Sequence, residues 1–196
     1  ELQQLCSRPG DSVEVFLQPG TYHLMPTPII DPSCGNCQDP NTPVHATVGL
    51  HVRGKFVRII GPVERSAVIY THAGYGLYFD GCAKAEIVNL SITGGVRDTA
   101  GAATDAAIVV KNSEILIRNN KIYDNIGDSS TVAKVIVGIM GICGRENSRM
   151  TIQGNEIIRN SWDGIAMYRD SEAVIEDNVV DGVDKATGQR VGGGRG

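Results

Sequence analysis

Three basic residues, Lys111, Arg145 and Arg169, fall on or just after the first strand of successive sequence repeats, where we expect side chains to face solvent. A positioned basic side chain can remove a proton as a general base, the first step of a β-elimination. We therefore predict these three residues as candidate catalytic bases. The alternative is that Lys111, Glu146 and Arg169 form one column of alternating charge, a surface ladder that contributes little to stability.

Three acidic residues, Asp80, Asp105 and Asp163, lie near the same strands. Carboxylates from neighbouring coils can bind calcium through their oxygens. A calcium ion beside a substrate carboxylate neutralises it and acidifies the neighbouring proton. We predict these residues as metal ligands and calcium as the cofactor. The alternative for Asp105 and Asp163 is a turn in which the carboxylate caps local backbone groups.

Four aromatic residues accompany these charges, and they are Tyr78, Tyr123, Trp162 and Tyr168. Aromatic rings offer flat apolar faces on which sugar rings can pack. We predict them as substrate-binding residues. For Trp162 the alternative is that the ring covers a corner of the core.

A repeat positions all of these side chains. Four segments of 21 residues match column by column without a gap, and they are 75–95, 105–125, 140–160 and 163–183. One column consists of Ile87, Ile117, Ile152 and Ile175. Apolar and polar residues alternate within each segment, which is the periodicity of a strand. Stacked repeats of this size and composition predict a coiled solenoid of parallel strands, a parallel β-helix.

The turns within the repeat support this register. One corner position is occupied by Asn89, Asn119, Gly154 and Asp177, all residue types that tolerate a left-handed backbone. The next position holds Leu90, Asn120, Asn155 and Asn178, so the asparagines are expected to form an amide ladder between coils. An earlier corner holds Lys84, Glu114, Arg149 and Glu172, whose alternating charges are compatible with parallel stacking.

Composition limits the classes of function. The chain has 196 residues and a net charge of −4, from 22 acidic and 18 basic side chains. An acidic balance argues against nucleic acid as a partner, because phosphate binding needs a basic stripe. No run of about 18 apolar residues is present, so we expect no membrane span.

Five cysteines are present, and two of them form the motif Cys34-Gly-Asn-Cys37 in a region expected to be a loop. The motif can close a small disulfide or supply half of a zinc site, with Cys6, His23 or His45 as further ligands. Both alternatives stay open at this point.

Proline divides the chain into two sections. Six of the eight prolines lie between residues 19 and 43, and none follows Pro62. Since proline removes a ladder donor, we expect an irregular N-terminal section, 1–48, and a repetitive section, 49–196, in one structural unit. The last coil would expose unpaired strand edges, so we expect self-association there or a longer solenoid of which this chain is a fragment.

The Ile-x-x-Asn-x-Ile corner and the sequence Pro19-Gly20-Thr21-Tyr22 resemble the right-handed parallel β-helix, or pectin-lyase-like, superfamily. The resemblance covers roughly residues 10–183 and implies an all-β, right-handed, single-stranded parallel β-helix with an irregular N-terminal cap. It also implies an exported protein, extracellular or periplasmic, that binds or processes an acidic polysaccharide in a groove on the first-strand face. Catalysis would be calcium-assisted β-elimination or epimerisation of uronates.

The resemblance leaves the activity open. The chain contains neither the Asn-Thr-Asp or Asp-Asp pairing of polygalacturonases nor the Asp-Pro-His of epimerases. The rival interpretation is a non-catalytic scaffold or partner-binding β-helix. One variant of it is an accessory protein that handles a metal through Cys34 and Cys37.

Overall fold

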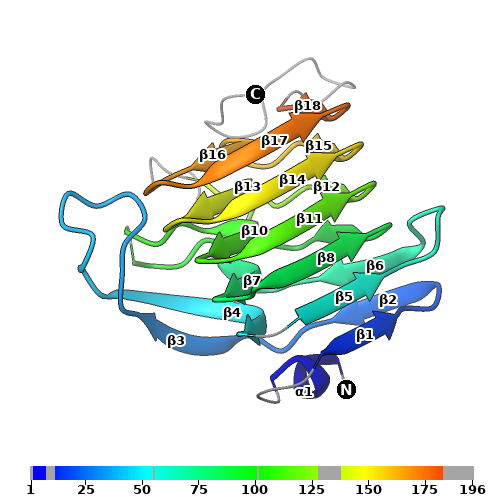
Figure 1. The fold of residues 1–196 in the computed structure, drawn as a ribbon, viewed down its shortest axis with the longest axis horizontal. Helices are drawn as coiled ribbons and strands as arrows, with labels where there is room; N and C mark the ends of the chain where they lie inside the picture. The colour runs from blue at the N-terminus through cyan, green and yellow to red at the C-terminus, as the bar shows by residue number, and fades with distance from the viewer. Residues whose placement is uncertain (1, 8–11, 55, 101, 128–137, 183–196) are drawn as a thin grey trace.

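The computed structural model describes residues 2–7, 12–54, 56–100, 102–127 and 138–182. It contains one short helix, α1 (Leu2–Ser7), and three six-stranded sheets. From β5 onward, successive strands enter the three sheets in rotation, so that each sheet receives every third strand (Figure 1). We name the sheets after the strand of each repeat that they contain: the first-, second- and third-strand sheet.

The second-strand sheet carries the isoleucine column. Its strands, in spatial order, are β1 (Val13–Phe16), β5 (Phe56–Ile60), β8 (Lys84–Val88), β11 (Glu114–Arg118), β14 (Arg149–Gln153) and β17 (Glu172–Glu176), all parallel. Ile117 pairs with Ile87 on one side and with Ile152 on the other, and Ile152 pairs with Ile175. The predicted stacking of this column is confirmed.

The third-strand sheet follows the predicted corner. Its strands are β2 (Gly20–His23), β6 (Ala67–Tyr70), β9 (Ser91–Thr93), β12 (Lys121–Tyr123), β15 (Glu156–Ile158) and β18 (Val179–Asp181). At this corner φ is 59° for Asn89, 53° for Asn119, 65° for Gly154 and 55° for Asp177, so the predicted left-handed backbone is confirmed.

The amide ladder at this corner is also confirmed. The backbone N–H of Asn120 donates to Oδ1 of Asn155 at 2.9 Å, and that of Asn155 donates to Oδ1 of Asn178 at 2.8 Å. A second ladder, which the sequence analysis did not identify, joins Asn125 to Asn160 through Nδ2 and Oδ1 at 2.8 Å. These bonds satisfy buried polar groups at two corners of the coils that contain these asparagines.

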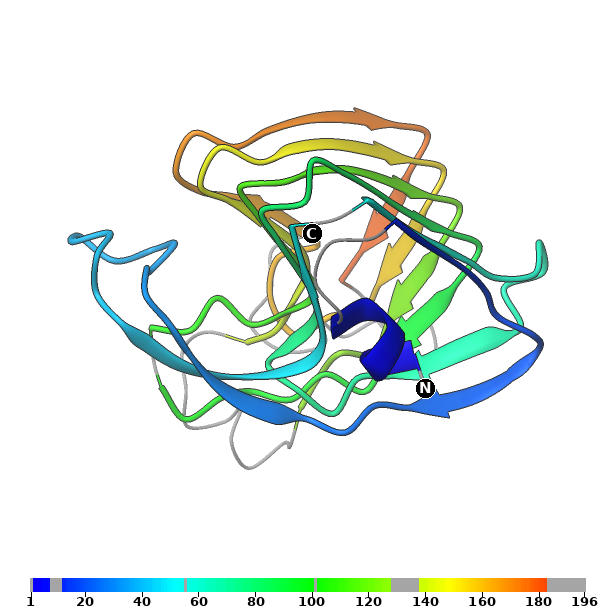
Figure 2. The same ribbon diagram turned by 60° about the horizontal axis from the view of Figure 1, so that its bottom comes forward.

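The first-strand sheet differs from the other two at one edge. Its strands are β3 (Thr27–Asp31), β4 (Val44–Arg53), β7 (Tyr75–Asp80), β10 (Ala106–Lys111), β13 (Met140–Arg145) and β16 (Ile165–Met167). All pairs are parallel except β3 with β4, which is antiparallel. Residues 27–48, from β3 through the first half of β4, extend sideways from the stack (Figure 2), and we name them the flap.

One predicted register is wrong. We expected Ala106 to lie beside Gly76 and Gly141, but it pairs with Tyr75 and Met140. The cause is the turn after β10, in which two residues separate β10 from β11, whereas three separate β7 from β8 and β13 from β14. The shorter turn moves β10 by one position, so Lys111 lies beside Asp80 and Arg145 instead of Glu146.

Two hydrophobic cores result from this arrangement. The larger core fills the space between the three sheets and contains the isoleucine column. The second lies on the outer side of the first-strand sheet, where Val44, Ala46 and Val48 of the flap pack with Tyr75, Tyr78 and Val109. The flap therefore covers the face on which we expected an open groove.

The two ends of the stack bear on two of the sequence predictions. Strands β1 and β2 lie within the section expected to be irregular, yet they pair in parallel with β5 and β6. At the other end Ile175 is 51% exposed, and residues 183–196 lie outside the described residues. Self-association at this end stays a prediction. Among the described residues no helix is long and apolar enough to cross a membrane.

Candidate functional site

The carboxylate of Asp31, at the end of β3, joins two of the predicted catalytic bases. Its Oδ1 accepts a hydrogen bond from Nζ of Lys111 at 2.7 Å, and its Oδ2 accepts one from Nη1 of Arg145 at 3.0 Å. All three side chains are buried, with residue exposures of 1%, 6% and 0%. Lys111 and Arg145 therefore lie next to each other, as two adjacent cations held by one carboxylate of the flap.

Arg145 is the most connected residue of this cluster. Its Nη1 also donates to the hydroxyl oxygens of Tyr75 at 3.1 Å and Thr104 at 3.0 Å, and its Nη2 donates to the carbonyl of Ser33 at 2.8 Å. Its Nε donates to Oε2 of Glu146 at 2.6 Å. Two cations and two carboxylates make the cluster neutral, which offsets the cost of removing the charges from water.

Arg169, the third predicted base, holds the loop of the flap. Its Nε donates to the carbonyl of Gly35 at 3.1 Å, and its Nη2 donates to the carbonyl of Cys37. Cys34 and Cys37 form a disulfide, so neither sulfur is a thiolate ligand for a metal. At Gly35 a Cβ atom would lie only 3.2 Å from Nε of Arg145, so glycine allows this close approach.

Three of the four predicted substrate-binding rings belong to the covered face. Tyr78 is 2% exposed and lies in the second core, while Trp162 and Tyr168 pack against that core and are half-buried. Burial raises the pKa of the Tyr78 hydroxyl well above its ordinary value. Tyr123 is the exception, because it lies on the outer side of the third-strand sheet.

The three predicted calcium ligands do not come together. The Asp80 carboxylate lies 3.6 Å from Nε2 of His51, and hydrogen bonding with this ring lowers the pKa of Asp80. Asp105 forms an ion pair with Arg97. Among the described residues no group of three or more His, Cys, Asp or Glu side chains could hold a metal ion. These residues do not fit a calcium site, and calcium binding stays a prediction without a located site.

Asp105 and Asp163 also differ in position. The carbonyl of Asp105 accepts from the N–H of Met140, and that of Asp163 accepts from the N–H of Gly141, so the two residues lie on opposite sides of β13. The alignment of segments 105–125 and 163–183 places the two residues in one column, and this prediction is wrong for the same reason as the register of β10. Asp163 is half-buried beside β16.

The buried carboxylate of Asp105 lies beside the half-buried carboxylate of Asp98. Its Oδ2 accepts from Arg97 and from the N–H of Asp98 at 2.8 Å, but its Oδ1 is buried without a hydrogen-bond partner. A Cβ atom at Gly74 would lie 2.6 Å from this Oδ1 and 2.1 Å from Oδ2 of Asp98, so both carboxylates face the same position. Burial, only partly offset by the charge of Arg97, raises the pKa of Asp105 to about 7.

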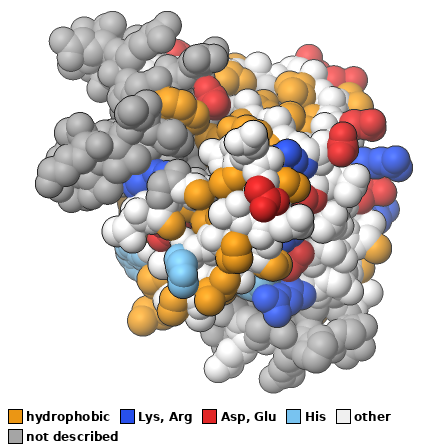
Figure 3. Space-filling view, turned by 90° about the vertical axis from the view of Figure 1, so that its left-hand side faces the viewer, with side chains coloured by type: hydrophobic (Ala, Val, Ile, Leu, Met, Phe, Trp, Pro, Cys, Tyr) orange, Lys and Arg blue, Asp and Glu red, His pale blue; other side chains and the backbone are white. Residues whose placement is uncertain are grey.

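The surface on this side of the molecule is mixed in character. Figure 3 shows hydrophobic, acidic and basic side chains interspersed, and the visible basic side chains do not gather into one continuous patch. The residues that sequence reasoning missed are the ones that the flap brings in, above all Asp31 and Ser33, and the Tyr75 and Thr104 hydroxyls. One signal was available in the sequence. If Lys111 and Arg145 are buried they need a carboxylate partner, and none of the aligned repeats contains one beside them, so the partner had to come from another segment.

An aromatic row lies on the outer face of the third-strand sheet; it contains Tyr123, which the sequence analysis predicted, and His23 and Tyr70, which it missed. His23 pairs with Tyr70, and Tyr70 pairs with Thr93. Ile122 pairs with Ile92, which brings Tyr123 beside Thr93. The rings of His23 and Tyr70 stack at 5.0 Å, and His72 stacks on His23 at 5.2 Å.

Comparison with protein families gives one match. The model of the right-handed β-helix region matches residues 63–192, which include β6 to β18 and four of the coils described above. Comparisons with curated proteins and with solved structures find no match. The parallel sheets, the isoleucine column and the asparagine ladders agree with this family. The chain therefore belongs to the family of the right-handed β-helix region.

Proposed function

We propose that this protein binds an acidic polysaccharide through the outer face of the third-strand sheet. The aromatic row formed by His23, Tyr70 and Tyr123 is the observation that carries the proposal. Strand alternation directs these side chains away from the core, and a polymer lying along the stack would meet a ring on several coils. Thr93, which is buried, lies between Tyr70 and Tyr123 in the row.

Basic side chains beside the row favour an acidic polymer. Nζ of Lys121 lies 5.1 Å from the ring centroid of Tyr123, a cation–π geometry. Arg65 and Arg159 lie nearby in ion pairs with Glu156 and Asp124. Lys121 places a positive charge directly beside the ring of Tyr123, with which a uronate carboxylate can pair.

The covered first-strand face is a poor location for catalysis. A general base must come within hydrogen-bond distance of the proton that it removes. Lys111 and Arg145 are buried, and each is bonded to Asp31. An alternative function as a calcium-assisted lyase or epimerase would require the flap to leave this face. An ultraviolet assay for unsaturated uronides on pectate and alginate, with and without calcium, tests it.

We also propose that the protein is exported, to the extracellular space or the periplasm. The Cys34–Cys37 disulfide supports this, because disulfides persist mainly in oxidising compartments. The variant in which these cysteines carry a metal has less support, since the bonded sulfurs are not available as ligands.

Binding to immobilised polygalacturonate and alginate tests the main proposal, with a neutral glucan as the control polymer. Tyr70→Ala and Tyr123→Ala are each expected to weaken binding about tenfold, a loss of about 1.4 kcal/mol that is typical of one aromatic contact. The matched control is Phe16→Ala, because Phe16 is an aromatic residue, 63% exposed, on the second-strand sheet. Equal binding by all three variants and the wild type, or no binding to either polymer, would contradict the proposal.

A further inference from the structure

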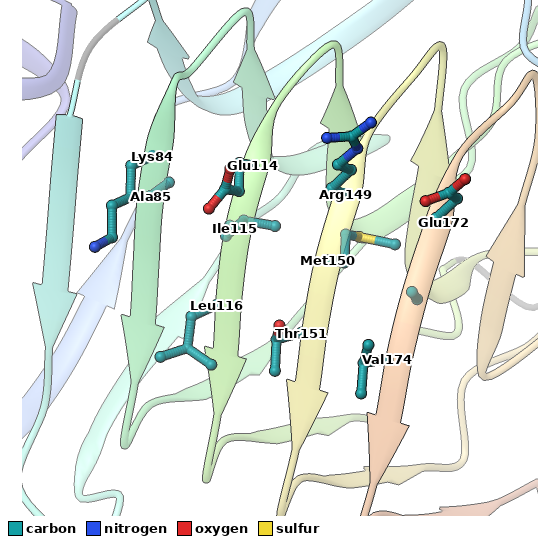
Figure 4. Close-up of a pocket in the computed structure, with 11 residues that line it drawn as sticks. Lys84, Ala85, Glu114, Ile115, Leu116, Arg149, Met150, Thr151, Glu172 and Val174 are labelled. Carbon is teal, nitrogen blue, oxygen red and sulfur yellow. The ribbon is translucent and has the colours of Figure 1, made fainter.

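A ladder of four charged side chains crosses the outer face of the second-strand sheet. We name Lys84, Glu114, Arg149 and Glu172 the charge ladder (Figure 4). Glu114 pairs in register with Arg149, and Arg149 pairs with Glu172, while Ile115 beside Ala85 fixes the position of Lys84. All four residues are exposed. The charge along the stack therefore reads positive, negative, positive, negative.

The charge ladder is not closed by ion pairs within the chain. In the part of the chain that the structure describes, none of its four side chains forms an ion pair or a hydrogen bond. The neighbouring row of outward side chains on the same sheet differs, because its members on β1, β5 and β8 are paired: Arg58 bridges Glu14 and Glu86. The charges of the ladder are thus available to another molecule.

Beyond β8 this neighbouring row is uncharged. It consists of Leu116, Thr151 and Val174, one residue on each of β11, β14 and β17 (Figure 4). Val174 is 55% exposed. A shallow hollow of about 470 Å³ lies between this row and the ladder. A small uncharged centre next to charged side chains is the usual composition of a protein interface.

We propose that this face binds a second copy of the same chain in a twofold-symmetric dimer. A twofold axis parallel to the strands, midway between β11 and β14, turns one face onto the other and reverses the order of the coils. Lys84 then meets the partner's Glu172, and Glu114 meets the partner's Arg149. Each pair occurs twice, as in any interface that uses the same surface on both copies.

The number and order of the charges are what make the face self-complementary. An alternating ladder with an even number of charges presents opposite charges when it is reversed onto itself, whereas an odd ladder presents like charges. Complementary charge contributes mainly to specificity and to the rate of association. Leu116 lies next to the axis and contributes apolar area. The dimer uses a different sheet from the aromatic row, so this inference does not depend on the polysaccharide proposal.

Sedimentation equilibrium over a range of protein concentrations tests the dimer. For the wild type we expect a monomer–dimer equilibrium that weakens as salt is added, because salt screens exposed charges. In Glu114→Arg the new arginine faces Arg149 of the other copy, and this repulsive contact occurs twice in the dimer. The dissociation constant is therefore expected to rise at least tenfold. A wild type that stays monomeric at every concentration, or a dimer that Glu114→Arg leaves unchanged, would overturn the proposal.

A double exchange separates contacts between copies from contacts within one. Glu114→Arg combined with Arg149→Glu makes the order of charges positive, positive, negative, negative. The alternation within the chain is then lost, but each charge still meets its opposite across the twofold axis. We expect the double variant to recover the dissociation constant of the wild type within about threefold. A double variant that dimerises no better than Glu114→Arg alone would overturn the inference, and thermal unfolding of each variant verifies that the fold is intact.

Discussion

Two arginines of the same coil show how differently two faces of this β-helix are used. Arg145 ends β13 on the first-strand sheet, is completely buried, and bonds to Asp31, Tyr75 and Thr104. Arg149 begins β14 on the second-strand sheet, only four residues later, and is exposed without such partners in the described structure. Both positions were expected to face outward. A position that points away from the central core is therefore not a surface position if another segment packs on it.

The strand sequences explain this difference. All six residues of β10 are buried, and the strand reads as a nearly continuous apolar run. In β11 buried and less buried residues alternate. Continuous apolar runs are typical of parallel strands that are covered on both faces, whereas alternation is typical of strands with one face in water. The burial of β10 on both faces thus agrees with its apolar sequence, and the alternating burial of β11 agrees with one open face.

Among substitutions on the two faces, Arg145→Ala is expected to cause the largest loss of unfolding free energy. Removing one partner of a buried ion pair leaves uncompensated charge, here one excess negative charge because Lys111 alone then faces Asp31 and Glu146, and costs about 3–5 kcal/mol of unfolding free energy. The matched variant Arg149→Ala on the open face, measured at a protein concentration at which the chain is monomeric, is expected to change stability by less than about 0.5 kcal/mol. Urea denaturation measures both. Similar losses for the two variants would contradict the distinction between the faces.

The raised pKa of Asp105 predicts that the unfolding free energy depends on pH through this residue. Its pKa is raised from 3.8 to about 7 in the folded protein, so between these values the folded state binds more protons than the unfolded state. This contribution to stability is complete below about pH 4 and is lost as the pH rises through about 7. The loss is about 4 kcal/mol at most, since one pKa unit corresponds to about 1.4 kcal/mol.

Unfolding free energies of the wild type and of Asp105→Asn, measured from pH 4 to pH 8, test this expectation. The variant is expected to lose less stability with rising pH than the wild type does. Glu114→Gln, on the open face, is the control and should follow the wild-type curve when both are measured at a protein concentration at which the chain is monomeric. If Asp105→Asn and the wild type follow parallel curves, Asp105 is ionised throughout the range, which contradicts its raised pKa.

Arg169→Ala is expected to have a smaller effect, because it loosens only the loop of the flap. The variant loses hydrogen bonds from a charged donor to the carbonyls of Gly35 and Cys37, worth about 1.5–3 kcal/mol for such a contact. Hydrogen exchange of residues 32–43 should accelerate, while that of β14 stays unchanged. The matched variant is Arg118→Ala, an exposed arginine of the second-strand sheet. Slow exchange of the loop in Arg169→Ala would show that other contacts hold it.

Features that recur in every coil could be predicted from the sequence. The isoleucine column, the left-handed corners and the ladder of Asn120, Asn155 and Asn178 depend on neighbours in the stack, and each copy of the repeat reports the same requirement. The register of β10 could not be predicted, because a turn shortened by one residue leaves the columns of β11 intact.

The flap could not be predicted either. The bond between Asp31 and Arg145 joins residues 114 positions apart in the sequence, and no periodicity links them. Sequence analysis therefore identified Lys111, Arg145 and Arg169 as outstanding residues but assigned them to an open groove. In the structure they hold the flap on the first-strand sheet.

Amine labelling followed by mass spectrometry tests the covered face most directly. Lys111 is 6% exposed and bonded to Asp31, whereas Lys84 is exposed on the second-strand sheet. In the native protein at neutral pH, an amine-reactive reagent should modify Lys84 rapidly and leave Lys111 unmodified until the protein unfolds. Labelling of Lys111 at the same rate as Lys84 would contradict the account, because it would mean that the flap does not cover the first-strand sheet.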